Sequence, residues 1–179
     1  GETQPLKHWT PVHMHLGTAD VTARIAIRRG AAVAPGGTAI VQIIADKPLA
    51  ALNGDRFILR DQSAMRTIGG GTVIDPFVAP RRSNAQTRAA QQAALENADP
   101  GAALAALLAC SPAGVDLAQF ERTFNLTAER AAALAAKSDI ALVGKEHRVA
   151  LPRATVDGIK QAALAALTNL HRESPQATG

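Results

Sequence analysis

Apolar and polar residues alternate along the first part of the chain in the pattern of half-buried β-strands. Residues 10–16 and residues 21–27 each place apolar side chains at every second position, which is the period of a strand with one buried face. Residues 38–45 are apolar on both faces except at Gln42, which predicts a strand covered from both sides. Further strands are predicted over residues 55–60 and 67–74. Five or six short antiparallel strands indicate a small closed barrel or a sandwich.

Three consecutive glycines, residues 69–71, interrupt the last of these strands. Because glycine has no Cβ, the cluster predicts either a sharp bend or the close approach of another backbone. A phosphate-binding loop is the alternative, but it requires a Lys and a Ser or Thr where a helix begins. The β-branched run Thr72-Val73-Ile74 follows here, so the pattern favours a turn in the barrel.

Helical periodicity replaces strand alternation after Pro80. Helices are predicted over residues 86–97 and 100–110, after Asp116, and over residues 127–137, where Thr127 is the expected N-cap. Leu134 and the alanines around it are the expected buried set of the last of these helices. A short strand at Val115-Asp116 and a hairpin over residues 140–150 complete the pattern. Three helices, a short strand and a terminal hairpin predict a winged helix.

Apolar residues continue at helical spacing after Pro152, as far as Leu170. The predicted helix is long and amphipathic, and no further apolar segment follows to cover it. We therefore expect this helix to dock on the winged helix or to fray.

Basic residues are concentrated in the first half of the chain. Residues 1–90 hold 11 Lys and Arg against 6 Asp and Glu, whereas residues 91–179 hold 8 against 9. A polyanionic partner is therefore more plausible for the first half. The single cysteine, Cys110, excludes an intrachain disulfide and a cysteine-based zinc site. No apolar run is long enough to span a membrane, and no paired carboxylates or nucleophile–base pair predicts an enzyme site.

His13 and His15 share one face of the first predicted long strand. Two histidines at this spacing are candidate metal ligands, but the sequence shows no third ligand nearby. A solvated or interface-facing pair is the favoured interpretation, so we expect no metal site.

Several motifs occur in the order and spacing of a known translation-factor domain. The motifs are Asp20-Val21-Thr22, Lys47-Pro48, Gly54-Asp55-Arg56-Phe57, Leu59-Arg60-Asp61 and Arg66-Thr67-Ile68-Gly69-Gly70-Gly71. Together they resemble the third domain of EF-Tu-type translational GTPases, and more closely that of the selenocysteine-specific elongation factors (SelB). One departure is Gly17, because EF-Tu has an arginine at the corresponding position.

The resemblance implies a C-terminal fragment of such a factor with three parts. Residues 1–79 would form a six-stranded antiparallel β-barrel, residues 80–152 a winged helix, and residues 153–179 the first helix of a second winged-helix module. The resemblance places Arg60, Gln62 and Ser63 where EF-Tu touches the tRNA backbone, and Arg66 follows in the same loop. Such side chains suit contacts to phosphate and ribose. Further candidates for nucleic-acid contact are Arg81, Arg82, Lys145 and Arg148.

The same resemblance implies the partners of the chain. They are selenocysteyl-tRNA, the ribosome and, through modules beyond this stretch, the hairpin of a selenoprotein mRNA. The winged helix would act as a spacer toward that mRNA-binding end during UGA recoding. GTP and Mg²⁺ would belong to the GTPase domain of the intact factor, so this fragment is expected to be a cytoplasmic, monomeric non-enzyme without a cofactor.

A winged-helix transcription regulator with a β-barrel sensor domain is the alternative interpretation. It requires a recognition helix that reads base edges with Arg, Asn or Gln side chains. The predicted helix over residues 127–137 is mostly alanine, with Arg130 and Lys137 as its basic residues. This composition favours a spacer or docking module.

Overall fold

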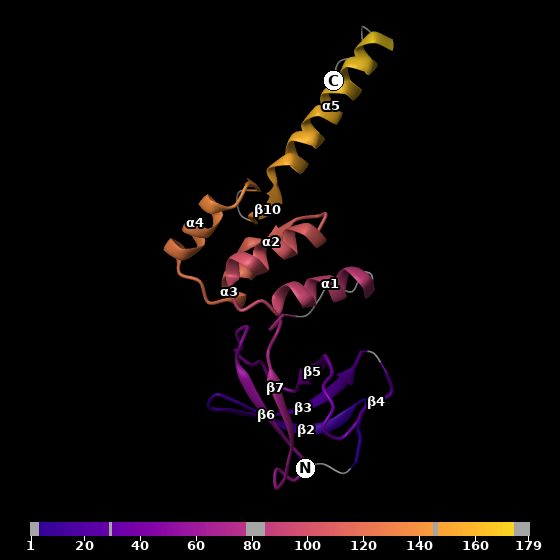
Figure 1. Cartoon of the computed structure of the whole chain (residues 1–179), viewed down its shortest axis with the longest axis vertical. Coiled ribbons are helices and arrows are strands. Elements are labelled where there is room, and N and C mark those ends of the chain that lie inside the picture. Colours follow the sequence, from indigo (N-terminus) through magenta and orange to yellow (C-terminus); the bar gives the residue numbers. More distant parts are fainter. Residues whose placement is uncertain (1–3, 29, 78–84, 145–146, 174–179) are drawn as a thin grey trace. The chain divides into compact units, whose positions relative to one another are not determined.

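The chain divides into two compact units, Gly1–Val78 and Ala79–Gly179 (Figure 1). A computed structural model describes residues 4–28, 30–77, 85–144 and 147–173 of these units. Each unit has its own buried side chains, and each is described here by itself.

A curved antiparallel sheet forms the first unit (Figure 1). Its strand order is β5-β3-β2-β6-β7, and two-residue strands β1 and β4 pair separately with each other. The bounds are β1 (Leu6–Lys7), β2 (Thr10–Leu16), β3 (Ala19–Ile27), β4 (Ala32–Val33), β5 (Val41–Ala45), β6 (Arg56–Arg60) and β7 (Thr67–Thr72). The predicted antiparallel β domain is confirmed. The described residues form seven strands in two sheets instead of six, because β1 and β4 are too short to show alternation in the sequence.

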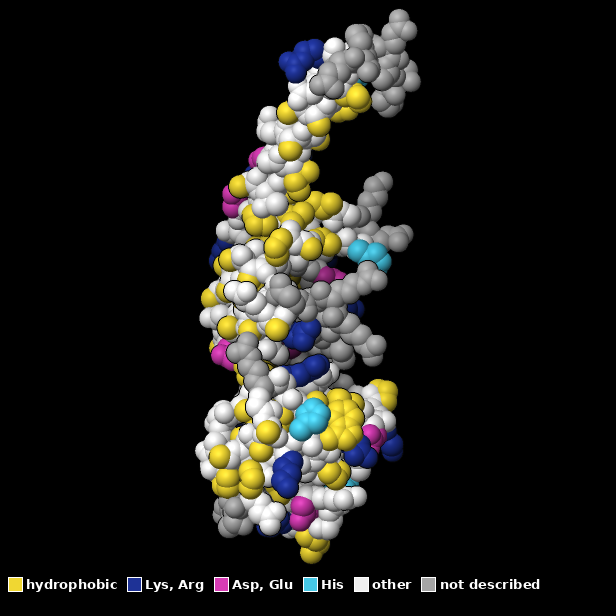
Figure 2. All heavy atoms as spheres, turned by 90° about the vertical axis from the view of Figure 1, so that its right-hand side faces the viewer, with side chains coloured by type: hydrophobic (Ala, Val, Ile, Leu, Met, Phe, Trp, Pro, Cys, Tyr) yellow, Lys and Arg dark blue, Asp and Glu magenta, His cyan; other side chains and the backbone are white. Residues whose placement is uncertain are grey.

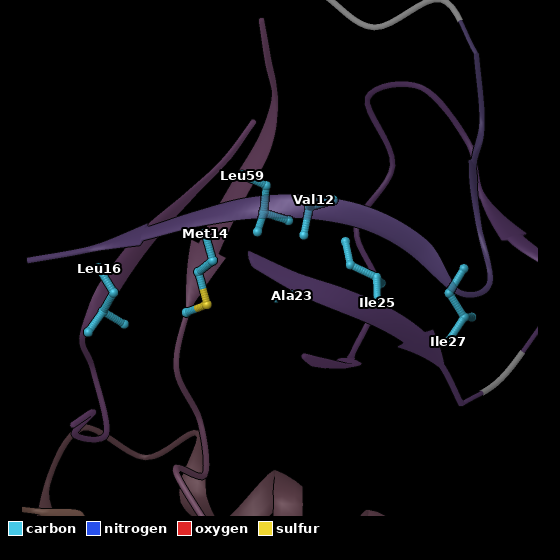
Figure 3. Close-up of a cluster of buried hydrophobic side chains, with 7 residues drawn as sticks. All are labelled: Val12, Met14, Leu16, Ala23, Ile25, Ile27 and Leu59. Atoms are coloured by element: carbon cyan, nitrogen blue, oxygen red, sulfur yellow. The ribbon is translucent and has the colours of Figure 1, made fainter. Parts of the chain in front are cut away.

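The alternating apolar residues of β2 and β3 form the core of this unit. Side chains from β2, β3 and β6 gather on the concave side of the sheet (Figure 3). The buried set is Val12, Met14, Leu16, Ala23, Ile25, Ile27 and Leu59. Alternation on β2 and β3 therefore predicted the buried face correctly.

Two details of the sheet differ from the prediction. Strand β5 lies at an edge and leaves Ile44 exposed, so it is not covered from both sides. Strand β7 runs without interruption through the three glycines, none of which has a positive φ. A Cβ at Gly70 would lie 2.8 Å from the Phe57 carbonyl oxygen, and one at Gly71 would lie 2.7 Å from Phe57 Cζ. The glycines therefore allow β6 to approach closely, and they do not precede a helix as a phosphate loop requires.

Helices and a three-stranded sheet of order β8-β10-β9 form the second unit. The bounds are α1 (Ala85–Leu95), α2 (Pro100–Cys110), β8 (Val115–Asp116), α3 (Leu117–Thr123), α4 (Ala128–Lys137), β9 (Ile140–Val143), β10 (Val149–Pro152) and α5 (Arg153–Glu173). The order from α2 to β10 is the helix, strand, helix, helix and hairpin succession that the sequence predicts.

Three of these helices begin where the sequence predicts, and a side-chain oxygen accepts a backbone hydrogen bond at each start. Asp99 Oδ2 accepts from the Ala102 N–H at 2.8 Å, and Thr127 Oγ1 accepts from the Arg130 N–H at 3.3 Å. Asp116 caps α3 in the same way. Each side-chain oxygen satisfies a backbone donor that has no partner within the helix.

Two expectations for this unit are wrong. Helix α4 has no buried residue, and Leu134 is only half-buried, because the small alanines around it cover little area. The docking expected for helix α5 is not seen either, since the helix runs to Glu173 and exposes Ile159, Leu164, Leu167 and Leu170. Figure 2 shows hydrophobic side chains along the surface of this helix. No helix in the described ranges has the length and apolar character needed to cross a membrane.

Candidate nucleic-acid interface

The loop between β6 and β7, residues 61–66, carries the predicted tRNA-contacting residues. Arg60 is the last residue of β6, and Arg66 directly precedes β7. The pairing of the two strands shifts between Leu59 and Arg60, so that Arg60 lies opposite Thr67. A bulge of this kind twists a strand and redirects the side chains beyond it. All four predicted residues, Arg60, Gln62, Ser63 and Arg66, are exposed within this one loop or at its base.

The carboxylate of Asp61 holds the β6–β7 loop together. Asp61 Oδ1 accepts hydrogen bonds from Ser63 Oγ at 2.9 Å, from the Met65 N–H at 3.0 Å and from the Arg66 N–H at 3.3 Å. Its backbone N–H donates to the Arg66 carbonyl at 2.9 Å, and its carbonyl accepts from the Ala64 N–H at 2.8 Å. One residue thus fixes the course of the whole loop.

Hydrogen bonding to the charged form of Asp61 lowers its pKa. The bond from the Ser63 hydroxyl is the largest cause, desolvation opposes it, and the N–H groups of Arg66 and Met65 add to the lowering. Asp61 is therefore a carboxylate under neutral conditions, which is the form that accepts these bonds. The sequence analysis missed this residue as an organiser of the loop, although an Asp with Ser two positions later is a known turn pattern.

Both arginines are held at the base of the loop. Arg60 Nη1 donates to the Ala64 carbonyl at 3.0 Å, which uses one of the five N–H donors of the guanidinium. Arg66 Nε lies 4.0 Å from Asp61 Oδ2. Held in this way, the Arg60 guanidinium loses less side-chain entropy when it binds a phosphate.

The remaining predicted contact residues do not join this loop. Arg81, Arg82 and Lys145 lie outside the described residues. Arg148 belongs to the second unit, where its Nη2 donates to Glu121 Oε1 at 3.3 Å. Arg66 pairs with a carboxylate too, so it is the place of Arg148 in the second unit that separates it from the loop arginines.

The histidine pair lies on the convex side of the first sheet. His13 Nδ1 is 3.3 Å and His15 Nε2 is 3.9 Å from Asp20 Oδ1. Within the described residues, no three His, Cys, Asp or Glu side chains are arranged to hold a metal ion. An open depression of about 580 Å³ next to His15 is lined also by Gly17, Arg56, Phe57, Ile58, Gly71 and Thr72.

Charges on the first unit are mixed. Figure 2 shows Lys and Arg side chains separated by hydrophobic, histidine and acidic side chains on the face in view. A ligand would therefore meet separate basic side chains among apolar and polar groups on that face. Such a surface suits a partner recognised by shape and by a few phosphate contacts.

The first unit matches a known family domain. Residues 1–80 match the family described as "Selenocysteine-specific elongation factor, beta-barrel domain". The chain is 38% identical over 73 residues to the selenocysteine-specific elongation factor of Desulfomicrobium baculatum, a stretch that covers 41% of this chain and 12% of the relative. It is 31% identical over 70 residues to that of Escherichia coli K12, covering 39% of this chain and 10% of the relative.

A third relative matches a longer stretch. The selenocysteine-specific elongation factor of Haemophilus influenzae is 30% identical over 103 residues, which cover 56% of this chain and 17% of the relative. This alignment is longer than the 80-residue family domain. The chain thus spans only a small part of each relative that it matches. Residues 1–80 are therefore a β-barrel domain of the selenocysteine-specific elongation factor family.

Proposed function

We propose that this chain is part of a selenocysteine-specific elongation factor and that its first unit binds the backbone of selenocysteyl-tRNA. The observation that carries the proposal is the β6–β7 loop of the family domain, in which Asp61 fixes a turn between Arg60 and Arg66. Two arginines on a rigid hairpin provide phosphate contacts that do not read the base sequence.

The second unit acts in this proposal as a spacer. Its α4 exposes mainly alanine, with Arg130 and Lys137 as its basic residues, and Arg148 is paired with Glu121. It would hold the tRNA-binding unit at a distance from the mRNA-hairpin-binding end of the intact factor on the ribosome. GTP and Mg²⁺ are assigned to the GTPase domain of that factor. The transcription-regulator alternative has no support from the family of the first unit.

The proposal predicts that Arg60→Ala and Arg66→Ala each weaken binding of the selenocysteine tRNA. Each change removes one phosphate contact, so we expect a loss of about fivefold, or about 1 kcal/mol. The slope of log affinity against log salt should fall by about one for each change. A gel-shift titration at several salt concentrations measures both quantities.

Arg172→Ala is the matched control, because Arg172 is an exposed arginine on α5 in the second unit. Equal tRNA affinity of the Arg60→Ala, Arg66→Ala and unchanged proteins would refute the proposal. Sequence-specific binding to duplex DNA that is lost on Arg130→Ala would establish the regulator instead.

A further inference from the structure

Met65 is the most exposed large apolar side chain among the described residues. Its side chain is 84% exposed, whereas the next, Ile159, is 60% exposed. Single exposed apolar side chains are common and need no explanation by themselves. Met65 differs because it lies in the β6–β7 loop, directly before Arg66 and within the turn that Asp61 organises.

The backbone at Met65 is held on both sides. The Met65 N–H donates to Asp61 Oδ1 at 3.0 Å, and the Arg66 N–H donates to the same oxygen at 3.3 Å. Ala64, directly before it, has a φ of 56°, a left-handed conformation that is unfavourable for a residue with a Cβ. The loop thus tolerates a strained residue directly before Met65, and strained backbone residues cluster at functional sites.

Ser63 has a role within the loop itself. A hydroxyl has one proton, and that of Ser63 is donated to Asp61 Oδ1. Ser63 therefore helps Asp61 to position the loop and has no proton left to donate to RNA. Among the loop residues, the two arginines, Gln62 and Met65 are then the exposed side chains best placed to meet a partner.

We propose that Met65 packs against ribose in the minor groove of a double-stranded RNA stem while Arg60 and Arg66 contact the phosphates beside it. This inference rests on the proposed function, because it takes the partner to be an RNA. The minor groove of A-form RNA is wide and shallow and displays the ribose hydroxyls. A loop that carries an exposed apolar side chain and two arginines matches such a surface, where apolar sugar atoms lie between charged phosphates. The contact recognises helix shape and is independent of base sequence.

The first test compares Met65→Ala with Arg60→Ala in the full chain. The probes are a short RNA hairpin with a fully paired stem and the DNA hairpin of the same sequence. Met65→Ala should weaken RNA binding by about fivefold and leave the salt slope unchanged, because it removes no phosphate contact. Arg60→Ala should weaken binding and reduce the slope. Met65→Leu should retain most of the affinity, and the unchanged protein should prefer RNA over DNA.

Ile159→Ala is the matched control, since it removes an exposed apolar side chain elsewhere. Met65→Ala removes a side chain that contacts little of the protein, so its thermal midpoint should match that of the unchanged chain. Equal RNA affinity of Met65→Ala and the unchanged chain, while Arg60→Ala binds more weakly, would overturn this inference and leave the proposed function in place. Unchanged affinity for all variants would overturn both.

The second test uses the two methionines of the chain as an internal comparison. Met14 is 4% exposed and Met65 is 84% exposed, so dilute hydrogen peroxide should convert Met65 to its sulfoxide first. Saturation with the RNA hairpin should slow oxidation of Met65 at least about threefold, as followed by peptide mass spectrometry. Such slowing is expected if the side chain loses solvent contact in the complex. Equal oxidation rates with and without bound RNA would overturn the inference.

Discussion

The surroundings of Asp61 and Asp75 shift the pKa values of these two carboxyl groups in opposite directions. Hydrogen bonds from Ser63 and from backbone N–H groups lower the pKa of Asp61. Burial raises the pKa of Asp75, and the bond that its Oδ1 accepts from the Phe77 N–H at 2.9 Å opposes that rise. Loop order that depends on the Asp61 carboxylate is present above the ordinary pKa of an Asp and is lost as the pH falls through the lowered value.

For Asp75, the predicted dependence of stability on pH has the opposite sign to that for Asp61. Its folded pKa lies above its unfolded value, so its contribution to stability is fully present below the unfolded pKa and is lost as the pH rises through the folded pKa. Asp75→Asn keeps an acceptor for the Phe77 N–H and removes the buried charge. We expect a higher urea midpoint for the first unit at pH 7 and a smaller difference at pH 3. A lower midpoint at pH 7 would show that the charge itself is stabilising.

Contacts within the loop were the part of the site that the sequence indicated least clearly. Arg60, Gln62, Ser63 and Arg66 were selected by charge, polarity and resemblance, and the structure brings them into one loop. The role of Asp61 depends on a turn with a left-handed residue at Ala64, a position where the sequence has neither Gly nor Asn. Side chains that stabilise a turn are hard to recognise when the turn residue is atypical.

At the scale of elements, short-range signals predicted the boundaries well. Strand β2 has the predicted bounds, α2 begins at the predicted residue, and α3 and α4 begin after the predicted residues Asp116 and Thr127. Caps and alternation depend on residues within one turn or strand, so the sequence contains them directly. The edge position of β5 and the exposure of α4 depend on which elements lie nearby, and no local pattern records that information.

Helix α2 is the central packing element of the second unit. One of its buried residues gives a prediction for the stability of that unit. Leu104 on α2 is 1% exposed, whereas Leu164 on α5 is 58% exposed. Leu104→Ala should lower the free energy of unfolding of the second unit by about 2–5 kcal/mol, because it removes buried methyl groups and leaves a cavity. Leu164→Ala should change it by less than about 0.5 kcal/mol. Urea denaturation followed by circular dichroism at 222 nm measures both, and similar losses for the two variants would show that α5 packs against a partner surface in solution.

At the scale of the whole molecule, the two units have separate cores. The first is built from β2, β3 and β6, and the second draws its buried residues from helices such as α2 and α3 and from the small sheet. The sequence indicates this division through the change from strand alternation to alanine-rich helices.

Because the two units have separate cores, we predict that RNA binding is lost when the first unit unfolds and is kept when only the second unit unfolds. Ile25 is fully buried in that unit, so Ile25→Ala should lower the thermal midpoint of the first unit and abolish RNA binding at temperatures above that midpoint. Leu104→Ala should melt the second unit early and leave binding of the RNA hairpin within about twofold of the unchanged protein, because the β6–β7 loop depends on the first core. Calorimetry locates the unfolding midpoint of each unit in each variant. Gel-shift titrations of each variant, at a temperature above the midpoint of its destabilised unit and below that of its other unit, measure this difference. An equal loss of RNA binding in the two variants would mean that the second unit shares the RNA contact, and the spacer role would then have to be abandoned.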